Sequence, residues 1–353
     1  MAGYLARMAE QGFEEVVLVH DAKTGLRGAI AIHSTARGPA LGGTRMWVYP
    51  SESAAVEDVM CLARGMSYKS AAAELALGGG KGVIIGDPSR DKSEALFRAY
   101  GRFVEKMNGR FITAADMGTE ENDLDSIRLE TDHVVGGRAV GSPSPFTAYG
   151  VWKAMKACAV EVFGSPDLEG LCVAVQGVGS VGRALCQHLA DEGARLIVTD
   201  LDRERVRMAE ELWGATAVES DLIYSQECDI FAPCAGGGAV NRDSADRLRC
   251  RIVAGAANNV LKEDELGTVL HERGILYAPD YVANAGGLIF VEFKRQGGKS
   301  EDQTRAHIDL IEGRMKEIFR RSREQKLRPE VVANMFAEEK MRQEPEGSLP
   351  GTQ

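Results

Sequence analysis

The sequence has little that would tie it to a membrane, a metal ion or a nucleic acid. No apolar run in its 353 residues reaches bilayer-spanning length, and the first ten residues lack the apolar core of a signal peptide. The six histidines and seven cysteines show neither His-Glu-x-x-His nor Cys-x-x-Cys spacing. We therefore expect no metal site, and free thiols in a reducing cytoplasm. With 42 basic and 52 acidic residues the formal net charge is −10, which disfavours general binding to nucleic acids or anionic membranes.

Glycine, by contrast, is abundant, with 40 residues. This content suits the tight turns of an α/β protein better than a helical bundle. The length predicts two domains, each with a core of its own. We expect an N-terminal mixed α/β domain over residues 1–141 and a Rossmann-type doubly wound domain over 142–325, with the boundary at Ser142-Pro-Ser-Pro145.

Two lysines of the N-terminal region stand among small and apolar residues, where a merely solvated charge is not expected. Lys69 lies near the end of a predicted amphipathic helix that Ser51 caps. Lys81 follows three glycines and precedes the apolar Val83-Ile84-Ile85, a predicted buried strand. Partial burial and a second ammonium group nearby would lower the pKa of such a lysine, which makes Lys81 a candidate base. The alternative is an ordinary glycine loop with solvated lysines.

Two further stretches of this region carry polar groups at predicted turns. Residues 38–45, Gly-Pro-Ala-Leu-Gly-Gly-Thr-Arg, are expected to form a glycine loop whose N–H groups bind a carboxylate, or else a plain turn. A predicted strand from Phe111 leads directly to Asp116, which is either a general acid or base or a turn residue. A hairpin over 16–33 and a helix over 92–107 complete the predicted elements.

The C-terminal half carries the most specific motif. A strand predicted over 171–176 leads into Gly177-Val-Gly-Ser-Val-Gly182 and a helix, and the next strand ends at Asp200, eighteen residues after Gly182. This arrangement is typical of a dinucleotide site, whereas a chance glycine turn is the alternative. The pyrophosphate would reach the helix N-terminus, so the expected cofactor contacts are Gly177, Gly179, Ser180, Val181 and Gly182. Asp200 would accept hydrogen bonds from the adenosine ribose and repel a 2′-phosphate, so NAD is expected over NADP.

Three later strands, predicted over 228–232, 251–254 and 275–278, each end in a loop of small or amide residues. In an open parallel sheet ligands bind beyond the carboxyl ends of the strands, so these loops are expected to border the cofactor. The residues concerned are Cys234, Ala235, Asn258, Asn259 and Asn284. Caps or turns are the alternative for the asparagines, and Cys234 is expected to pack rather than to act as a nucleophile.

The last part of the chain is predicted to be helical. A capping box at Ser300–Gln303 opens a long helix, and Pro329 suits the first turn of another. The polar tail, residues 346–353, is expected to be disordered.

Taken in order, these segments resemble the glutamate/leucine/phenylalanine/valine dehydrogenase family, most closely its leucine dehydrogenases. The resemblance runs from about Tyr4 to about Lys340 and is strongest in GPALGGTRMW, MSYKSAAAELALGGGKGVIIGDP, TAADMGT, VQGVGSVG, AGAANN and YAPDYVANAGG. It implies an NAD-dependent, homo-oligomeric enzyme that deaminates leucine, valine or isoleucine to the 2-oxo acid and ammonia. It also implies that the first domain, joined by C-terminal helices at about 326–345, binds substrate and carries the subunit contacts, and that a cleft closes by hinge motion.

The resemblance implies roles for individual residues as well. Lys69 binds the substrate α-carboxylate, helped by the backbone of Gly42 and Gly43; Lys81 activates water, and Asp116 relays protons at the amino group. Thr147 and Asn259, with Asn258 beside it, position the substrate and the nicotinamide carboxamide. The apolar walls of the side-chain pocket are Leu41, Ala114, Leu288 and Val291.

Two alternatives stay open at this point. Phe146 and Leu288 depart from the leucine dehydrogenase pattern and favour a phenylalanine dehydrogenase, whereas Ala114 favours aliphatic substrates. A non-catalytic dinucleotide-binding sensor is a candidate of another class. The presence of Lys69, Lys81 and Asp116 argues against it, because a sensor has no need of a lysine base.

Overall fold

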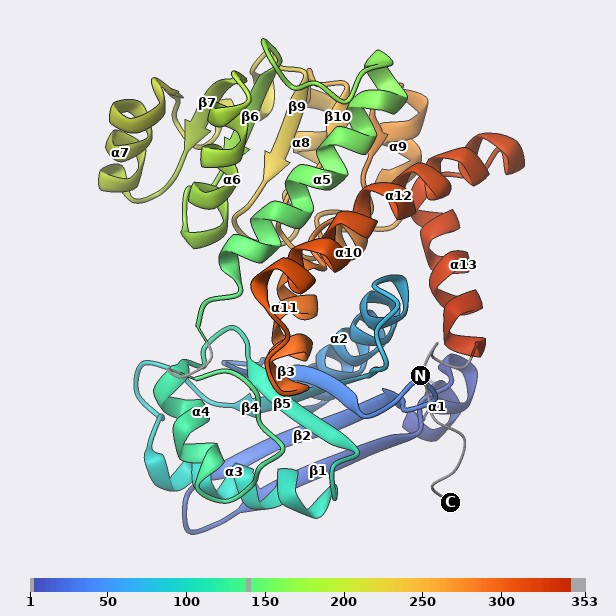
Figure 1. The fold of residues 1–353 in the computed structure, drawn as a ribbon. Coiled ribbons are helices and arrows are strands. Elements are labelled where there is room, and N and C mark those ends of the chain that lie inside the picture. The colour runs from blue at the N-terminus through green and yellow to red at the C-terminus, as the bar shows by residue number, and fades with distance from the viewer. Residues whose placement is uncertain (1–2, 138–140, 344–353) are drawn as a thin grey trace. The chain divides into compact units, whose positions relative to one another are not determined.

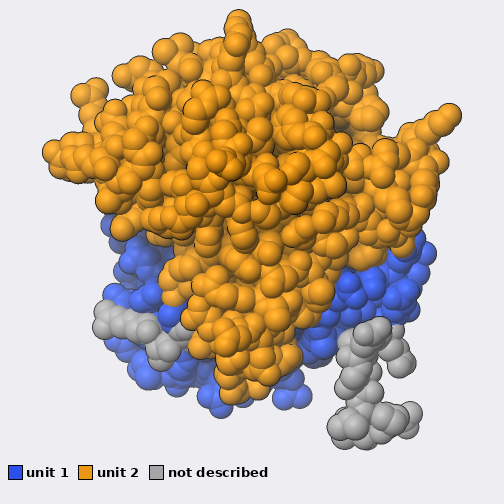
Figure 2. All heavy atoms as spheres, turned by 45° about the horizontal axis from the view of Figure 1, so that its top comes forward, with its two compact units in different colours: residues 1–141, 337–353 blue, residues 142–336 orange. Residues whose placement is uncertain are grey.

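The chain folds into two compact α/β units, as the sequence predicts. The computed structural model describes residues 3–137 and 141–343 (Figure 1). Unit 1 comprises residues 1–141 and 337–353, and unit 2 comprises residues 142–336 (Figure 2). The tail expected to be disordered, residues 346–353, lies outside the described residues.

Unit 1 is built on a five-stranded sheet. The strands lie in the order β1 (Glu15–Asp21), β2 (Leu26–Ser34), β4 (Gly78–Ile85), β3 (Ala40–Trp47) and β5 (Phe111–Ala115). β1 and β2 form the predicted antiparallel hairpin, and β2 is antiparallel to β4. β3 is parallel to both β4 and β5, so the carboxyl ends of these three strands meet at one edge of the sheet.

Helices cover both faces of this sheet. α2 (Glu52–Ala72) begins at the predicted cap, Ser51, whose side chain accepts a hydrogen bond from the Ala54 N–H. Its apolar residues pack on one face of the sheet, against Ala29, Ala31 and Val83. α3 (Glu94–Lys106) packs on the other face, against Ile30, Ile32 and Ile84, because successive strand residues point to opposite sides. α1 (Tyr4–Gln11) and α4 (Glu121–Arg128) complete the helices of residues 1–141 that the structure describes.

The expected glycine loop at residues 38–45 is a strand from Ala40 onward, so the loop prediction was wrong for residues 40–45. Residues 40–47 form β3, and the three glycines before Lys81 belong to β4 rather than to a loop before it. A Cβ on Gly42 would stand 1.8 Å from the Gly80 oxygen and 3.3 Å from Cγ of Met66 on α2. One on Gly79 would stand 2.0 Å from the Ser67 nitrogen. Glycine is needed here because strand and helix backbones approach each other closely, not because the chain turns.

The C-terminal segment of unit 1 is attached by polar contacts. The buried Arg37 donates from Nη1 to the backbone oxygens of Lys340 (2.6 Å) and Gln343 (3.0 Å). Tyr68 of α2 donates to Glu338 at 2.7 Å. Residues far apart in the sequence are thereby held in one unit.

Unit 2 is built on a six-stranded parallel sheet, in the order β11-β10-β9-β6-β7-β8. The strands are β6 (Cys172–Gln176), β7 (Arg195–Thr199), β8 (Thr216–Ala217), β9 (Ile230–Pro233), β10 (Ile252–Val253) and β11 (Leu276–Tyr277). The helical connections are α6 (Ser180–Asp191), α7 (Arg203–Trp213), η1 (Leu222–Ser225), α8 (Arg242–Arg247), α9 (Leu266–Glu272) and α10 (Asp280–Ala283). The chain order reverses between β6 and β9, which is the switch point where doubly wound sheets bind ligands.

The remaining helices are α5 (Ser144–Phe163), α11 (Gly286–Arg295), α12 (Glu301–Gln325) and α13 (Pro329–Arg342). α12 has the predicted capping box and buries Ile308, Ile311, Met315 and Ile318 along one side. The division between the units falls within α13. Within the described ranges, no helix is long and apolar enough to cross a bilayer.

Candidate active site

Lys81 and Asp116 form an ion pair in unit 1. Lys81 points to the α2 side of the sheet, as its neighbours Ala31 and Val83 do, and Asp116 follows β5 directly. Nζ of Lys81 lies 3.3 Å from Oδ1 of Asp116, and the lysine side chain is only 7% exposed. Burial lowers the pKa of Lys81, although Asp116 opposes the shift. Burial alone would raise the pKa of Asp116, but Lys81 and Arg45 outweigh it and lower that pKa, so the carboxylate stays ionised.

Three side chains continue this cluster, and the sequence analysis identified none of them. Arg45 donates from Nε to Oδ2 of Asp116 at 3.0 Å and from Nη1 to Oδ2 of Asp58 at 3.0 Å. The Tyr49 hydroxyl donates to the same Asp58 oxygen at 2.6 Å. Had residues 40–47 been predicted as a strand, period-two alternation would have placed Arg45 on the α2 face.

The opposite face of the same strands holds a buried hydroxyl cluster. The Thr44 and Thr113 hydroxyls are 2.7 Å apart, and Thr44 donates to the Tyr100 hydroxyl at 2.7 Å. A Cβ on Gly82 would lie 2.0 Å from that tyrosine oxygen. These contacts join β3, β5 and α3 behind the ion pair, so the strands that carry it are held from both sides.

The other substrate residues expected in unit 1 lie on the same elements. Lys69 is half-buried in the last turn of α2, and Leu41 is buried in β3. Ala114 in β5 is partly exposed and pairs with Gly43, on which a Cβ would stand 2.9 Å from Cβ of Asp116. The roles of Lys69, Gly42, Gly43, Leu41 and Ala114 in substrate binding stay predictions.

In unit 2 the glycine motif forms a tight turn at the switch point. Gly177 has φ +94° and donates its N–H to the Thr199 oxygen at 2.8 Å. A Cβ on Gly177 would stand 2.9 Å from Cβ of Ala235, and one on Gly182 would stand 1.9 Å from the Gly177 oxygen and 3.4 Å from Cβ of Cys234. The loop after β9 therefore lies against the turn, which brings four expected cofactor residues together, Gly177, Gly182, Cys234 and Ala235.

Gly179 differs from its two neighbours in the motif. It is the N-cap of α6, with φ −70°, which any residue adopts. A Cβ there would meet only the flexible end of Arg205, at 3.6 Å. The protein itself therefore gives no reason for glycine at this position, whereas a ligand at the helix N-terminus does.

Asp200 lies beside the turn, as the motif predicts. Its Oδ2 accepts a hydrogen bond from the Val178 N–H at 2.7 Å, and its Oδ1 accepts one from the Asp202 N–H at 2.9 Å. Nη1 of Arg205 lies 3.8 Å from Oδ2. An arginine therefore accompanies the carboxylate that is expected to face the ribose.

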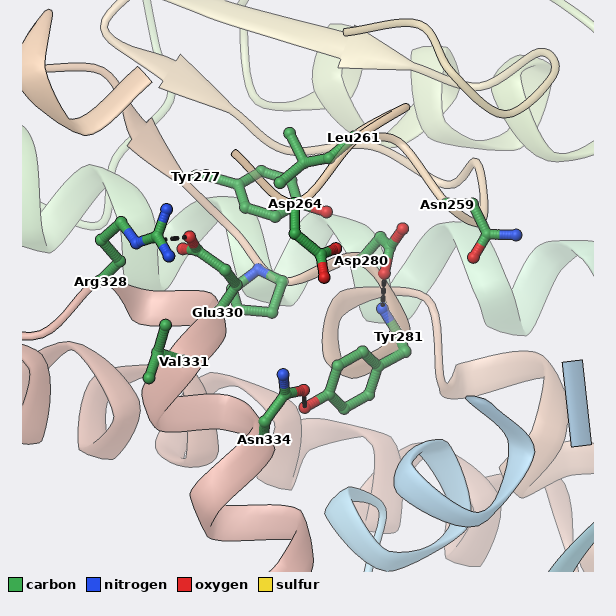
Figure 3. Close-up of a pocket in the computed structure, with 11 residues that line it drawn as sticks. Asn259, Leu261, Asp264, Tyr277, Asp280, Tyr281, Arg328, Glu330, Val331 and Asn334 are labelled. Carbon is green, nitrogen blue, oxygen red and sulfur yellow. Dashed lines mark hydrogen bonds and ion pairs between the residues drawn. The ribbon is translucent and has the colours of Figure 1, made fainter. Parts of the chain in front are cut away.

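The loop that carries Asn258 and Asn259 borders a pocket in unit 2 (Figure 3). Asp280 fixes this loop, because its Oδ2 accepts the Val260 N–H at 2.9 Å. Tyr281 closes another side, with its hydroxyl donating to Asn334 of α13 at 3.0 Å. The lining residues are Asn259, Leu261, Asp264, Tyr277, Pro279, Asp280, Tyr281, Arg328, Glu330, Val331 and Asn334. None of these residues belongs to the glycine turn. The pocket therefore borders the loop of Asn258 and Asn259 and is separate from the turn that is expected to bind the dinucleotide.

Thr147 lies in the first turn of α5, and Leu288 and Val291 lie on α11, which packs against it. A Cβ on Gly287 would stand 2.4 Å from Oγ1 of Thr147. Leu288 is buried and Val291 is partly exposed. The structure therefore groups these three expected site residues at one helix contact of unit 2.

Comparison with known proteins shows which family the chain belongs to. A family model described as Glu/Leu/Phe/Val dehydrogenase, dimerisation domain, matches residues 13–133. A second, described as Glutamate/Leucine/Phenylalanine/Valine dehydrogenase, matches residues 198–344. The chain belongs to the glutamate/leucine/phenylalanine/valine dehydrogenase family.

Relatives are similar over nearly the whole chain. The leucine dehydrogenase of Bacillus cereus is 51% identical over 333 residues, which cover 93% of this chain and 91% of that protein. The valine dehydrogenase of Streptomyces coelicolor is 45% identical over 337 residues, covering 94% and 92%. The crystal structure of L-tryptophan dehydrogenase from Nostoc punctiforme matches with a TM-score of 0.85 at 41% identity, covering 96% of this chain and 98% of that one. The predicted family, the two-domain α/β fold and the oxidoreductase class are confirmed.

A dehydrogenase of this family implies a nicotinamide dinucleotide, and unit 2 fits one. Nδ2 of Asn284 donates to the backbone oxygens of Ala256 (3.1 Å) and Ala257 (3.3 Å) and to Oδ1 of Asn258 (2.9 Å). Oδ1 of Asn284 is buried and has no hydrogen-bond partner. Buried amide oxygens nearly always have a donor, and the carboxamide N–H of a nicotinamide is a suitable one.

Metal and thiol chemistry find no comparable support in the part of the chain that the structure describes. No cluster of three or more His, Cys, Asp or Glu residues there could hold a metal ion. Burial raises the pKa of the Cys234 thiol to about 12, so it stays protonated, in keeping with a packing role.

Proposed function

We propose that this dehydrogenase catalyses the NAD-dependent oxidative deamination of an apolar L-amino acid, namely leucine, valine or isoleucine. The observation that carries the proposal is the buried Lys81–Asp116 pair, a lysine with a lowered pKa beside an ionised carboxylate. An amine of this kind is suited to remove a proton from water at moderate pH. The relatives named leucine dehydrogenase and valine dehydrogenase support the substrate class.

In the proposed reaction each residue has one task. Lys69, with the backbone of Gly42 and Gly43, binds the substrate α-carboxylate. When bound, the nicotinamide supplies the acceptor for the α-hydrogen, which leaves as hydride and yields an iminium. Neutral Lys81 takes a proton from the water that adds to this iminium, and Asp116 relays protons at the amino group as ammonia departs.

The two units divide the work in this proposal. Unit 1 binds the amino acid and forms contacts between subunits of a homo-oligomer. Unit 2 binds NAD through the glycine turn, Ser180, Val181, Cys234, Ala235 and Asp200, and through Thr147, Asn258 and Asn284 near the nicotinamide. Asn259 contacts the substrate. The doubly wound sheet with its glycine turn at the switch point supports the second assignment.

The side-chain pocket is proposed to be apolar and to prefer aliphatic substrates. Leu41, Ala114, Leu288 and Val291 carry no group that pairs with a γ-carboxylate. Phe146, which favoured an aromatic substrate in the sequence, is 8% exposed and stacks on Phe290 with ring centroids 4.4 Å apart. Its ring is occupied by packing within unit 2, which weakens the case for phenylalanine.

A substrate panel tests this proposal directly. We expect kcat/KM, measured by NADH absorbance, to be highest for L-leucine or L-valine. L-phenylalanine should be lower by only about tenfold, with overlap between the aliphatic and aromatic classes, because a methylene or two in an apolar pocket is worth only about 1–3 kcal/mol. L-glutamate should fall at least about 1000-fold, since its carboxylate would be buried without a partner. A tenfold preference for phenylalanine would overturn the aliphatic assignment. If no amino acid gives NADH, the non-catalytic dinucleotide-binding sensor would be favoured.

Cofactor choice gives a second expected result. NAD should exceed NADP in kcat/KM by about 100-fold or more, because the Asp200 carboxylate would repel a 2′-phosphate at a cost of a few kcal/mol. Arg205 lies beside that carboxylate, so Arg205→Ala should widen the preference. Asp200→Asn should narrow it to within about tenfold. Equal kcat/KM for both cofactors in the unmodified protein would show that Asp200 does not face the ribose.

A further inference from the structure

We propose that Arg45 is a positioning residue for the deamination, which turns Asp116 toward Lys81 and offsets the negative charge gathered around that lysine. The inference rests on the proposed function, in which Lys81 is the base. The sequence motifs gave Arg45 no role. The proposal comes from the contacts of its guanidinium.

The geometry divides the two oxygens of Asp116 between two cations. Oδ1 lies 3.3 Å from Nζ of Lys81, and Oδ2 accepts from Nε of Arg45 at 3.0 Å. Contacts at both oxygens fix the plane of the carboxylate, which a single contact would leave free to rotate. A Cβ on Gly43 would stand 2.9 Å from Cβ of Asp116, so glycine at this position of β3 leaves room for the aspartate beside the strand that carries Arg45.

Arg45 is itself held in place from behind. Its Nη1 donates to Asp58 of α2 at 3.0 Å, and the Tyr49 hydroxyl donates to the same carboxylate oxygen at 2.6 Å. The Arg45 side chain is 19% exposed. A guanidinium bonded through two of its nitrogens to two carboxylates has one orientation, and a lysine ammonium at this position would not reproduce both contacts.

The charges around Lys81 define what Arg45 does electrostatically. Asp116 after β5 and Asp58 on α2 are anions that raise the pKa of Lys81, whereas Arg45 on β3 lowers it. Ala31 of β2, which pairs with Lys81, carries no charge. Lys69 of α2 is the other cation that the proposed function places at this site. Removing Arg45 would leave both carboxylates acting on Lys81, so its pKa would rise. Removing the charge of Asp58 would lower it.

Two substitutions of opposite effect test the proposal. In Arg45→Gln, the midpoint of the rise of kcat/KM for L-leucine with pH should move up by about one pH unit, and kcat at pH 8 should fall about 10- to 100-fold. In Asp58→Asn the midpoint should move down. Arg45→Lys keeps the charge but loses one contact, so kcat should fall about tenfold with little change of the midpoint.

The matched control is Arg98→Gln, which removes another arginine–carboxylate pair of unit 1. Arg98 lies on α3, over the opposite face of the sheet, and donates to Glu130 at 2.7 Å. It should change neither kcat nor the midpoint. An unmoved midpoint in folded Arg45→Gln, or shifts of the same sign in Arg45→Gln and Asp58→Asn, would overturn the proposal.

A readout independent of turnover separates this inference from the proposed function. The rate at which acetic anhydride acetylates Lys81, followed by mass spectrometry against pH, reports the neutral fraction of that amine. Arg45→Gln should shift this curve upward and Asp58→Asn downward, whether or not an amino acid substrate is found. If the unmodified protein oxidises no amino acid, the proposed function fails while these curves still decide the electrostatic role of Arg45.

Discussion

Replacing Lys81 by alanine is expected to lower kcat for L-leucine by at least about 100-fold while NADH binding is retained, because the variant lacks the group that we propose as the base. The glycine turn that we propose as the dinucleotide site belongs to unit 2, whereas Lys81 belongs to unit 1. The measurement pairs steady-state kinetics with NADH fluorescence titration. Lys106→Ala is a suitable control, since Lys106 lies in the last turn of α3 and packs over the Phe103 ring. Near-normal turnover in a folded Lys81→Ala variant would mean that another group is the base.

The pH dependence of the unmodified enzyme has a definite sign. In the proposed reaction Lys81 acts in its neutral form, so kcat/KM should rise with pH as the ammonium loses its proton. Because burial lowers the pKa of Lys81, the midpoint of this rise should lie below the ordinary lysine value of about 10.4. The rise should be absent from the residual activity of Lys81→Ala. A flat profile from neutral to alkaline pH would contradict a lysine base.

Two neighbouring glycines are expected to fail in different ways when replaced by alanine. In Gly182→Ala the new Cβ would stand 1.9 Å from the Gly177 oxygen, so the turn must shift and unit 2 is destabilised. We expect a loss of several kcal/mol in unfolding free energy, as for other overpacked sites, and NAD binding too weak to measure. In Gly179→Ala the Cβ meets only Arg205, so the melting temperature should hold while NAD affinity falls at least about tenfold, because the pyrophosphate needs that space.

Calorimetry and NAD titration distinguish these outcomes. Gly313→Ala on α12 is the control, because nothing lies within 4 Å of a Cβ there, and it should leave both measurements unchanged or raise the melting temperature slightly. A Gly179→Ala variant with normal NAD affinity would show that the pyrophosphate does not approach this residue.

The sequence predicted the glycine turn, Asp200 and the Lys81–Asp116 region because each follows a local pattern of strand, turn and charge. It did not predict Arg45, because β3 lacks the alternation of apolar and polar residues that marks a strand. Residues 40–44 are buried between neighbouring strands and helices. Glycine is present there because α2 and β4 approach β3 closely, and not because the chain turns. The close approach of these elements depends on tertiary contacts, which cannot be predicted from a local sequence pattern.

Two further features depend on the folded chain in the same way. Phe146 stacks on Phe290, which lies 144 positions away in the sequence. Without knowledge of this contact, the presence of phenylalanine at position 146 favoured an aromatic substrate. The buried oxygen of Asn284 is defined by what surrounds it, including the backbone of Ala256 and Ala257, which take up its amide nitrogen. Sequence reasoning placed both residues near the site but gave no account of their contacts.

The Arg37 contacts to Lys340 and Gln343 bear on the order in which the protein matures on the ribosome. Unit 1 consists of residues 1–141 and a segment that begins at residue 337, so a nascent chain lacks part of this unit until the whole of residues 142–336 has been made. The continuous stretch 142–336 has no such requirement. Domains generally fold as units as they emerge. We therefore expect unit 2, which emerges later, to reach its native state first, while unit 1 waits for the segment whose Lys340 and Gln343 oxygens accept hydrogen bonds from Arg37.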